Sequence, residues 1–229
     1  MTGSARLGTA YWPEVQASTL LVPLGSVEQH GPHLPLDTDT RIAVAVATRA
    51  ATAAGADTMV APALAYGASG EHEGFPGTIS IGSTALSTVL IELVRSATRT
   101  FPRLVLVSGH GGNLDGVRTA LQALHAESRT VVACFPAVPG GDAHAGRTET
   151  SLLLAIAPHV VRGPPWIIGA TEPLAGLMPR LRSEGVAGVS PNGVLGNPAG
   201  ASAAEGERLL DRLVEHLLPL AYAARHRAS

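Results

Sequence analysis

Between residues 21 and 41 the sequence gathers several side chains that can bind metal ions. The stretch LVPLGSVEQHGPHLPLDTDTR contains the carboxylates Glu28, Asp37 and Asp39 and the imidazoles His30 and His33. Glu28 and His30 are two residues apart, so both project from the same face of an extended segment. Carboxylate oxygens and neutral imidazole nitrogens together suit zinc, manganese or iron(II), and paired ions recur in hydrolases. The pattern indicates a metal site; the alternative is a solvated loop whose Asp caps the next helix.

A second cluster, SGHGGN, runs from Ser108 to Asn113 directly after the apolar run LVLV. Its glycines permit close approach of the backbone, and His110 falls at the carboxyl end of the expected strand. The alternative is a glycine-rich turn that binds an anion at the start of the next helix. The glycine spacing differs from the dinucleotide fingerprint, and a phosphate turn has little use for a central histidine. His110 is therefore predicted to be a metal ligand.

The third cluster is DAHAGRTETS, which follows the apolar run VVACFP. His144 lies in the turn, where it suits a proton-shuttling role beside a metal-bound water. Glu149 falls about one turn into the next helix, where it either complements the helix dipole or points inward as a further ligand. His72, in EHEG, is expected only at the mouth of the site. His125 and His216 are expected to be surface or packing residues.

The composition indicates a well-buried globular chain. Of its 229 residues 45% are hydrophobic and 15% charged, the net charge is −2, and no basic stripe exists, which argues against nucleic acid as a partner. No signal peptide is recognisable, and no apolar segment approaches the roughly 20 residues that span a membrane. The lone cysteine, Cys134, is predicted to be a reduced core residue, which favours a cytoplasmic location.

Strands and helices are expected to alternate along the chain. The apolar run LVLV is typical of a strand covered on both faces, and the Ala-rich segment before Gly55 is typical of a helix. This alternation predicts a three-layer α/β/α sandwich with a mainly parallel sheet, as a single domain over residues 1–229 in which 1–10 form a loose leader. The expected strands are Leu20–Leu24, Thr58–Ala63, Thr78–Ile81, Leu104–Val107, Thr130–Phe135 and Ile167–Ile168, the expected helices are Thr40–Ala54, Leu86–Arg99, Leu114–Glu127, Thr148–Ala157 and Ala201–Ala224, and residues 185–200 are expected to be a glycine-rich loop.

The three clusters also carry a family resemblance. GSVEQHGPHLPLDTD, SGHGGN and HAGRTETS, in that order, resemble the signature blocks of the creatininase family of metal-dependent amidohydrolases. EHEGFPGTIS and GVLGNPAGASAAEGERLL fit as well, so the resemblance runs from about Leu20 to Leu213. The first block, including LDTDTRIAVA, is most similar to the branch associated with mycofactocin biosynthesis. That branch trims the C-terminal Val-Tyr dipeptide from a modified precursor peptide.

The resemblance implies a fold, a cofactor and an assembly. It implies the three-layer α/β/α fold, two divalent metal ions per subunit (Zn, Fe(II) or Mn) and a ring-shaped homo-oligomer, a hexamer or octamer. It also implies that Asp39 bridges the two ions and that His144 is the catalytic histidine. The other ligand positions that it implies are Glu28, His30 and His110.

Two positions depart from the family pattern. In creatininase itself a glutamate two residues after the GH histidine completes the second metal site, and here that position is Gly112. In relatives with GHGGN the glutamate of the ETS motif takes this role, which here is Glu149. Arg147 stands where many members carry Glu, which would alter the charge of the pocket.

The function expected from these features is hydrolysis of a C–N bond in a small peptide or small-molecule amide. The metal ions would lower the pKa of a shared water, and His144 would protonate the leaving nitrogen. The alternatives within the family are opening of the creatinine ring and hydrolysis of a formamide. Alternatives of another class are a non-catalytic metal-binding scaffold and, less favoured, a nucleotide-binding module.

Overall fold

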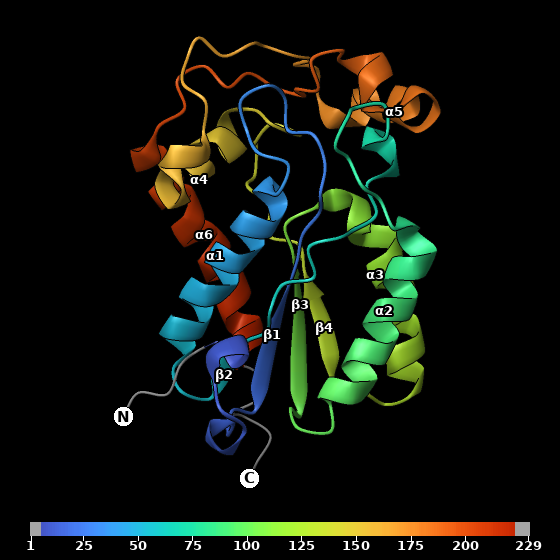
Figure 1. The fold of residues 1–229 in the computed structure, drawn as a ribbon, viewed down its shortest axis with the longest axis vertical. Helices are drawn as coiled ribbons and strands as arrows, with labels where there is room; N and C mark the ends of the chain where they lie inside the picture. Colours follow the sequence, from blue (N-terminus) through green and yellow to red (C-terminus); the bar gives the residue numbers. More distant parts are fainter. Residues whose placement is uncertain (1–5, 223–229) are drawn as a thin grey trace.

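A four-stranded parallel sheet forms the centre of the molecule (Figure 1). The computed structural model describes residues 6–222. The strand order is β2-β1-β3-β4, and all three pairings are parallel. All six residues of β1 are buried, as expected for a strand covered on both faces. The strands are β1 (Thr19–Leu24), β2 (Thr58–Val60), β3 (Arg103–Ser108) and β4 (Val131–Cys134).

Helices cover both faces of this sheet, which confirms the predicted three-layer α/β/α fold (Figure 1). Side chains alternate between the two faces along each strand, so that Leu21 and Val105 pack in one apolar cluster and Leu20 and Leu104 in the other. The first layer comprises α1 (Thr38–Ala54), α4 (Arg147–Ile156) and α6 (Ala203–Tyr222), and the second comprises α2 (Gly82–Ala97) and α3 (Leu114–Ala126).

Small side chains let the first helical layer pack closely. Aromatic residues make up only 3% of the chain, so alanine, valine and leucine supply most of the core. The buried face of α1 is largely alanine, and α6 buries residues at helical spacing, among them Leu210, Leu213 and Leu217. The single cysteine, Cys134, is buried and free in this core, as predicted.

Two of the expected strands do not form in the described part of the chain. Thr78–Ile81 contributes only an isolated antiparallel bridge between Val27 and Ile79, because α2 begins immediately afterwards at Gly82. Ile167–Ile168 is irregular, and each of the two side chains is 53% exposed. β-branched residues favour a strand only where a neighbouring strand and a covering layer exist, and neither is present here.

One helix was not predicted. Residues 174–189 form α5 (Leu174–Val189), which overlaps the first part of the expected loop 185–200. Its sequence contains Pro179 and a kink at Gly185, where φ is 67°, so its intrinsic helix propensity is low. Packing of Leu177 and Val186 against Phe75 and Leu195 supports this helix instead. Tertiary contacts have overridden local preference.

The expected loose leader is ordered where the structure describes it. Arg6 forms an isolated bridge with Val60, residues 7–9 form a 3₁₀ turn, and Leu7 packs against the second apolar cluster. Residues 1–5, and the last two residues of the expected helix 201–224, lie outside the described part. No helix within residues 6–222 is long and apolar enough to cross a membrane.

Two glycines bring the first turn of α1 against the carboxyl ends of β1 and β3. A Cβ on Gly25 would lie 1.9 Å from Oγ1 of Thr40, and a Cβ on Gly109 would lie 2.3 Å from the carbonyl oxygen of Asp39. Neither position therefore has room for a side chain. The carboxylate of Asp39 is thus held at the edge of the sheet where ligand sites in such folds are built.

Close packing of α6 on α4 makes a testable prediction at Gly206. A Cβ there would lie 1.9 Å from the carbonyl oxygen of Ser151, a backbone atom that cannot move aside. We expect Gly206→Ala to lower the free energy of unfolding by about 1–3 kcal/mol, measured by urea denaturation. The control is Gly176→Ala in α5, where nothing lies within 4 Å. It should stabilise by about 0.5–1 kcal/mol; equal effects of the two changes would contradict the packing argument.

Candidate metal centre

The structure brings all six sequence-predicted site residues together at the carboxyl ends of β1 and β3. Two come from the loop after β1, one from the first turn of α1, one from the turn after β3, and two from the segment between β4 and α4 and the first turn of α4. Five of the six are buried, and Glu149 is partly buried. The six residues are Glu28, His30, Asp39, His110, His144 and Glu149.

Glu28, Asp39 and His110 form one group of possible metal ligands. Nδ1 of His110 lies 3.2 Å from Oε1 of Glu28 and 3.1 Å from Oδ2 of Asp39. The other ring nitrogen, Nε2, lies 3.0 Å from the carbonyl oxygen of Ala68 and donates to it, since a carbonyl only accepts. Such a second contact is how proteins fix the ring and present the free nitrogen of a metal-ligating histidine.

A second group lies on the opposite side of Asp39. Nε2 of His30 is 3.0 Å from Oδ1 of Asp39 and 3.9 Å from Oε2 of Glu149. Nδ1 of His30 lies 3.1 Å from the carbonyl oxygen of Glu28, so the backbone also fixes this ring. The two oxygens of Asp39 therefore face different imidazoles, which is the arrangement of a carboxylate that bridges two ions.

The carboxylate of Glu28 fits a cation better than it fits this site without one. Glu28 is 0% exposed, and neither carboxylate oxygen has a hydrogen-bond partner within residues 6–222. Nitrogens of His72, His110 and His144 approach Oε1 at 3.3, 3.2 and 3.9 Å. Burial of an uncompensated carboxylate costs several kcal/mol. Since the donor set is oxygen and imidazole nitrogen, it suits a first-row divalent metal.

The charges in the site shift the pKa of its members in opposite directions. Burial by itself lowers the pKa of His30, but the charge of Asp39 and the hydrogen bond to it outweigh burial and raise the pKa to about 10. The pKa of His110 is raised well above its usual value in the same way, by Glu28 and Asp39 against burial. Burial raises the pKa of Glu149 to about 7. A metal ion that binds here would therefore have to displace protons.

His144 is held as a neutral ring on the other side of Glu28. Burial, and then the charges of His30 and His72, lower its pKa well below the usual value. Its Nε2 lies 2.8 Å from the carbonyl oxygen of Gln29, to which it donates, so Nδ1 faces Oε1 of Glu28. The next residue, Ala145, adopts φ 51°, a strained conformation for a non-glycine residue, and its N–H donates to Oε2 of Glu149 at 2.6 Å.

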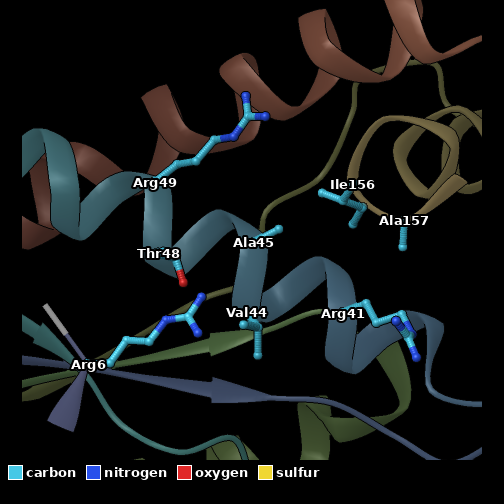
Figure 2. Close-up of a pocket in the computed structure, with 8 residues that line it drawn as sticks. All are labelled: Arg6, Arg41, Val44, Ala45, Thr48, Arg49, Ile156 and Ala157. Atoms are coloured by element: carbon cyan, nitrogen blue, oxygen red, sulfur yellow. The ribbon is translucent and has the colours of Figure 1, made fainter. Parts of the chain in front are cut away.

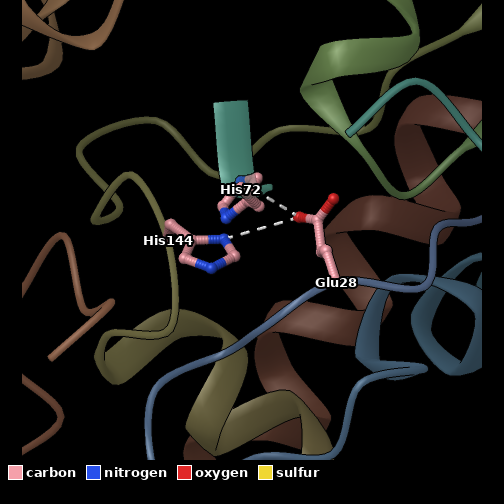
Figure 3. Close-up of side chains that lie close together, drawn as sticks. All are labelled: Glu28, His72 and His144. Carbon is pink, nitrogen blue, oxygen red and sulfur yellow. Dashed lines mark ion pairs between the residues drawn. The ribbon is translucent and has the colours of Figure 1, made fainter. Parts of the chain in front are cut away.

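His72 corrects the sequence analysis, which placed it only at the mouth of the site. It is 4% exposed, and its Nε2 lies 3.3 Å from Oε1 of Glu28, with His144 on the same side (Figure 3). The helix α5, which was not predicted, packs on the 3₁₀ turn Gly70–His72 that carries it. The only signal in the sequence was a histidine between two glutamates in a turn, which does not reveal burial.

Asn113, the last residue of SGHGGN, was also missed as a structural element of the site. Its Oδ1 accepts a hydrogen bond from the N–H of Ala68 at 2.9 Å. Its Nδ2 donates to the carbonyl oxygen of Gly25 at 3.1 Å and to Oγ of Ser108 at 3.3 Å. One buried amide therefore ties together the loops that carry Glu28, His72 and His110.

Some residues near the clusters point elsewhere. Nε2 of His33 lies 2.9 Å from Oγ1 of Thr150. Asp37 forms an ion pair at 2.7 Å with Arg41 on the next turn of α1. Neither belongs to a group of possible metal ligands among the described residues.

The structure also shows the surroundings of Arg147 and Gly112, the two residues that depart from the family pattern. Arg147 pairs with Glu205 of α6 at 2.8 Å, so its charge is neutralised outside the site. A Cβ on Gly112 would lie 2.4 Å from both Nε2 of His110 and Oε1 of Glu71, so no larger side chain fits there. The second carboxylate beside His30, after Asp39, is instead that of Glu149.

A separate hollow of about 350 Å³ beside α1 is distinct from this centre (Figure 2). Arg41 and Arg49 in its wall are already paired, with Asp37 and with Glu207 and Asp211. It contains no histidine or carboxylate and offers no comparable chemistry. Its lining residues are Arg6, Arg41, Val44, Ala45, Thr48, Arg49, Ile156 and Ala157.

Comparison with known protein sequences points to one family. The family model described as creatininase, creatinine amidohydrolase, matches residues 9–221. The chain is 56% identical over 199 residues to the mycofactocin precursor peptide peptidase of Mycolicibacterium smegmatis, which covers 85% of this chain and 81% of that protein. It is 32% identical over 197 residues to the creatinine amidohydrolase of Pseudomonas putida, covering 70% of this chain and 75% of that protein.

Solved structures described as creatininases have a similar fold. A provisionally assigned creatinine amidohydrolase from Bacteroides fragilis superposes with a TM-score of 0.82 at 26% identity and covers 100% of both chains. A mutant creatininase of the Zn-Zn type gives a TM-score of 0.72 at 26% identity, covering 95% of this chain and 97% of that chain. A creatininase described with Mn gives the same TM-score, 0.72, at 26% identity and covers 94% of this chain and 96% of that chain.

The shifted pKa of His30 predicts how metal affinity depends on pH. Because this pKa is about 10 in the metal-free protein, the ring carries both protons at pH 7, and metal binding must release the proton on Nε2. Raising the pH toward 10 reduces this competition, so zinc affinity should rise between pH 7 and 9, by about tenfold per pH unit for each proton displaced. Competition with a chelator of known affinity measures it, and affinity independent of pH would contradict the assignment.

Proposed function

Because the chain belongs to the creatininase family, we propose that it is a metal-dependent peptidase that hydrolyses a C–N bond in a modified precursor peptide. The substrate in this proposal is the mycofactocin precursor, from which the enzyme releases the C-terminal Val-Tyr dipeptide. The relative that is 56% identical, named mycofactocin precursor peptide peptidase, supports that choice. The main support for a metal-dependent reaction is the position of Asp39, whose two carboxylate oxygens face different imidazoles.

Two divalent ions, Zn, Fe(II) or Mn, would be held in this centre. Glu28, Asp39 and His110 would hold one ion, and His30 and Glu149, with Asp39 shared, would hold the other. When bound, such ions polarise the substrate carbonyl and lower the pKa of water enough to give hydroxide near neutral pH. The solved structures of the family described with zinc and with manganese support this cofactor class.

The contribution of His144 is proton transfer. Its neutral ring can accept a proton at Nδ1, the nitrogen that faces Glu28, while Nε2 stays bonded to the carbonyl oxygen of Gln29. The ring then returns that proton to the leaving nitrogen of the substrate, which would otherwise depart as a poor amide anion. The lowered pKa of His144 keeps the ring unprotonated at the start of this sequence.

The same-family alternatives are less well supported. Creatinine or a formamide would remain possible substrates of the metal centre, and the relative from Pseudomonas putida is named for creatinine. The position that carries a glutamate in creatininase is Gly112 here, however, and it is packed too tightly for a side chain. A non-catalytic scaffold would bind metal without turning over any amide, and it would leave the buried His144 without a role.

The assembly and location belong to the same proposal. We propose a homo-oligomer, a hexamer or octamer, that acts in the cytoplasm without nucleic acid or membrane partners. Exposed aromatic side chains such as Trp12, 87% exposed, and Tyr11, 77% exposed, support burial between subunits. The free Cys134 thiol and the net charge of −2 support the cytoplasmic location and the absence of nucleic acid, respectively.

The proposed bridge predicts the effect of one substitution. Asp39→Ala should remove both metal ions and abolish peptide hydrolysis, because both ligand groups share this residue. The control is Asp37→Ala, which removes a carboxylate from the same loop that pairs only with Arg41. Metal content by mass spectrometry and dipeptide release by liquid chromatography measure the two effects. Full metal content in Asp39→Ala would disprove the bridge.

The role of His144 predicts a different pattern. His144→Ala should lower kcat about 10²–10⁴-fold with metal content retained, since general acid–base transfer contributes on that order. Wild-type kcat in this variant would show that another group transfers the proton, whereas a wild-type protein that binds metal but hydrolyses no amide would support the scaffold alternative.

Direct comparison of substrates tests the specificity. A peptide ending in Val-Tyr, creatinine and a formamidopyrimidine should be incubated with the metallated protein under one set of conditions. We expect turnover of the peptide to exceed that of the other two by at least about 10²-fold; the reverse order would assign the chain to another reaction of the family.

A further inference from the structure

The sequence contains no lysine, so arginine is its only side chain with a permanent positive charge. Several of the arginines are neutralised by a carboxylate, as Arg41 is by Asp37 and Arg147 by Glu205. Arg162 is different, because it is exposed and forms no ion pair with any residue between 6 and 222. Its guanidinium group can therefore bind a negatively charged ligand.

Two hydrogen bonds place Arg162 against the loop that carries Glu28 and His30. Its backbone N–H donates to the carbonyl oxygen of His33 at 2.9 Å, and Nη1 of its side chain donates to the carbonyl oxygen of Pro32 at 3.3 Å. Pro32 lies only two residues after His30 in the sequence. A guanidinium group has five N–H donors, so the bond to Pro32 leaves donors for a ligand.

The segment that follows Arg162 is fixed against the same loop. Nε1 of Trp166 donates to the carbonyl oxygen of Arg162 at 2.7 Å, and the ring of Trp166 lies 6.1 Å from the ring of the buried His33. Nε2 of His33 in turn lies 2.9 Å from Oγ1 of Thr150, the residue after Glu149. These contacts connect Arg162 to the turn of α4 that carries a candidate metal ligand.

Exposed apolar side chains lie close to Arg162 in the same segment. Ile167 and Ile168 are each 53% exposed, and Nδ2 of Asn192 donates to the carbonyl oxygen of Ile168 at 2.9 Å, which fixes the backbone between them and the site. A single positive charge beside apolar side chains matches the end of a peptide with apolar or aromatic last residues. The guanidinium group complements the carboxylate, and the isoleucines complement the side chains.

We propose that Arg162 binds the C-terminal carboxylate of the peptide substrate and that Ile167 and Ile168 contact the side chains next to it. The inference rests on the proposed function, in which the enzyme releases a C-terminal dipeptide. Because all peptide bonds of the substrate are chemically alike, an enzyme that removes two residues must recognise the end of the chain. Two residues span at most about 7 Å, so the group that binds the carboxylate must lie close to the metal centre. An arginine on the loop of His30 meets this requirement.

Kinetics with two peptides test the contact. Both peptides end in Val-Tyr, and the terminus is a free carboxylate in one and a carboxamide in the other. We expect the wild type to hydrolyse the carboxylate peptide with a kcat/KM about 10–100-fold higher, as for a hydrogen bond to a charged group. Arg162→Gln should lose this preference through a higher KM for the carboxylate peptide, with kcat and the hydrolysis of the carboxamide peptide little changed.

Two further variants serve as controls. Arg162→Lys keeps the charge without the two-pronged geometry, so it should retain part of the preference. Arg99→Gln is the matched control, because Arg99 is also exposed and has no ion pair within the described residues. It precedes the amino end of β3, at the edge of the sheet opposite the metal centre, and its loss should leave the preference at the wild-type value.

Binding of the dipeptide product tests the inference without catalysis. Isothermal titration calorimetry of the metallated protein with Val-Tyr should give a Kd that rises about 10–100-fold in Arg162→Gln and stays at the wild-type value in Arg99→Gln. Val-Tyr amide should bind both the wild type and Arg162→Gln as weakly as Val-Tyr binds Arg162→Gln. Equal affinity of the wild type and Arg162→Gln for Val-Tyr, or no binding to either, would overturn the assignment.

The outcomes separate this inference from the proposed function. If the wild type and Arg162→Gln hydrolyse the peptide with the same preference for a carboxylate, another group binds the terminus, and the role of Arg162 is wrong while the function stands. If Val-Tyr binds through Arg162 but no peptide is hydrolysed, the carboxylate site stands and the proposed reaction is wrong.

Discussion

A buried carboxylate without a hydrogen-bond donor is the constraint on which the rest of the site depends. Glu28 is 0% exposed, and three imidazole nitrogens converge on its Oε1. Such a charge is tolerated only beside compensating charge, which protons on histidines supply in the metal-free protein and divalent ions would supply in the active one. Metal binding and stability are therefore coupled, since a ligand that binds only the folded state stabilises it.

Backbone carbonyls give the site its rigidity. One ring N–H of each of His30, His110 and His144 donates to a carbonyl oxygen, of Glu28, Ala68 and Gln29 respectively, and the other ring nitrogen faces a carboxylate. Because backbone atoms within packed loops move little, the free nitrogens are fixed before any ion binds. The amides of Gln29 and Asn113 extend this rigidity by linking the loops to one another. Glu149 reaches the same cluster because the first turn of α4 faces His30, with Oε2 of Glu149 3.9 Å from Nε2 of that ring.

The sequence by itself determined the fold class and indicated the residues of the candidate site. The parallel strands can be recognised in the sequence as short apolar runs. The side chains that could bind metal follow the carboxyl ends of these runs, where α/β folds place their ligand sites. The spacing of Glu28, His30 and Asp39 is local, so these three could be placed near one another from the sequence alone. His110 and Glu149 could be joined to them only through the expected fold and the family resemblance.

Only the tertiary structure decided burial, strand pairing and the protonation of individual rings. Ile167 and Ile168 have the composition of a strand but no neighbour to pair with, whereas α5 forms despite its proline and glycines because it packs on the rest of the chain. The side-chain nitrogen of Gln29 contacts partners 43, 115 and 164 residues away in the sequence. A hydrogen bond between distant segments leaves no periodicity or spacing in the sequence, since it depends on where the folded backbone brings two polar atoms within about 3 Å.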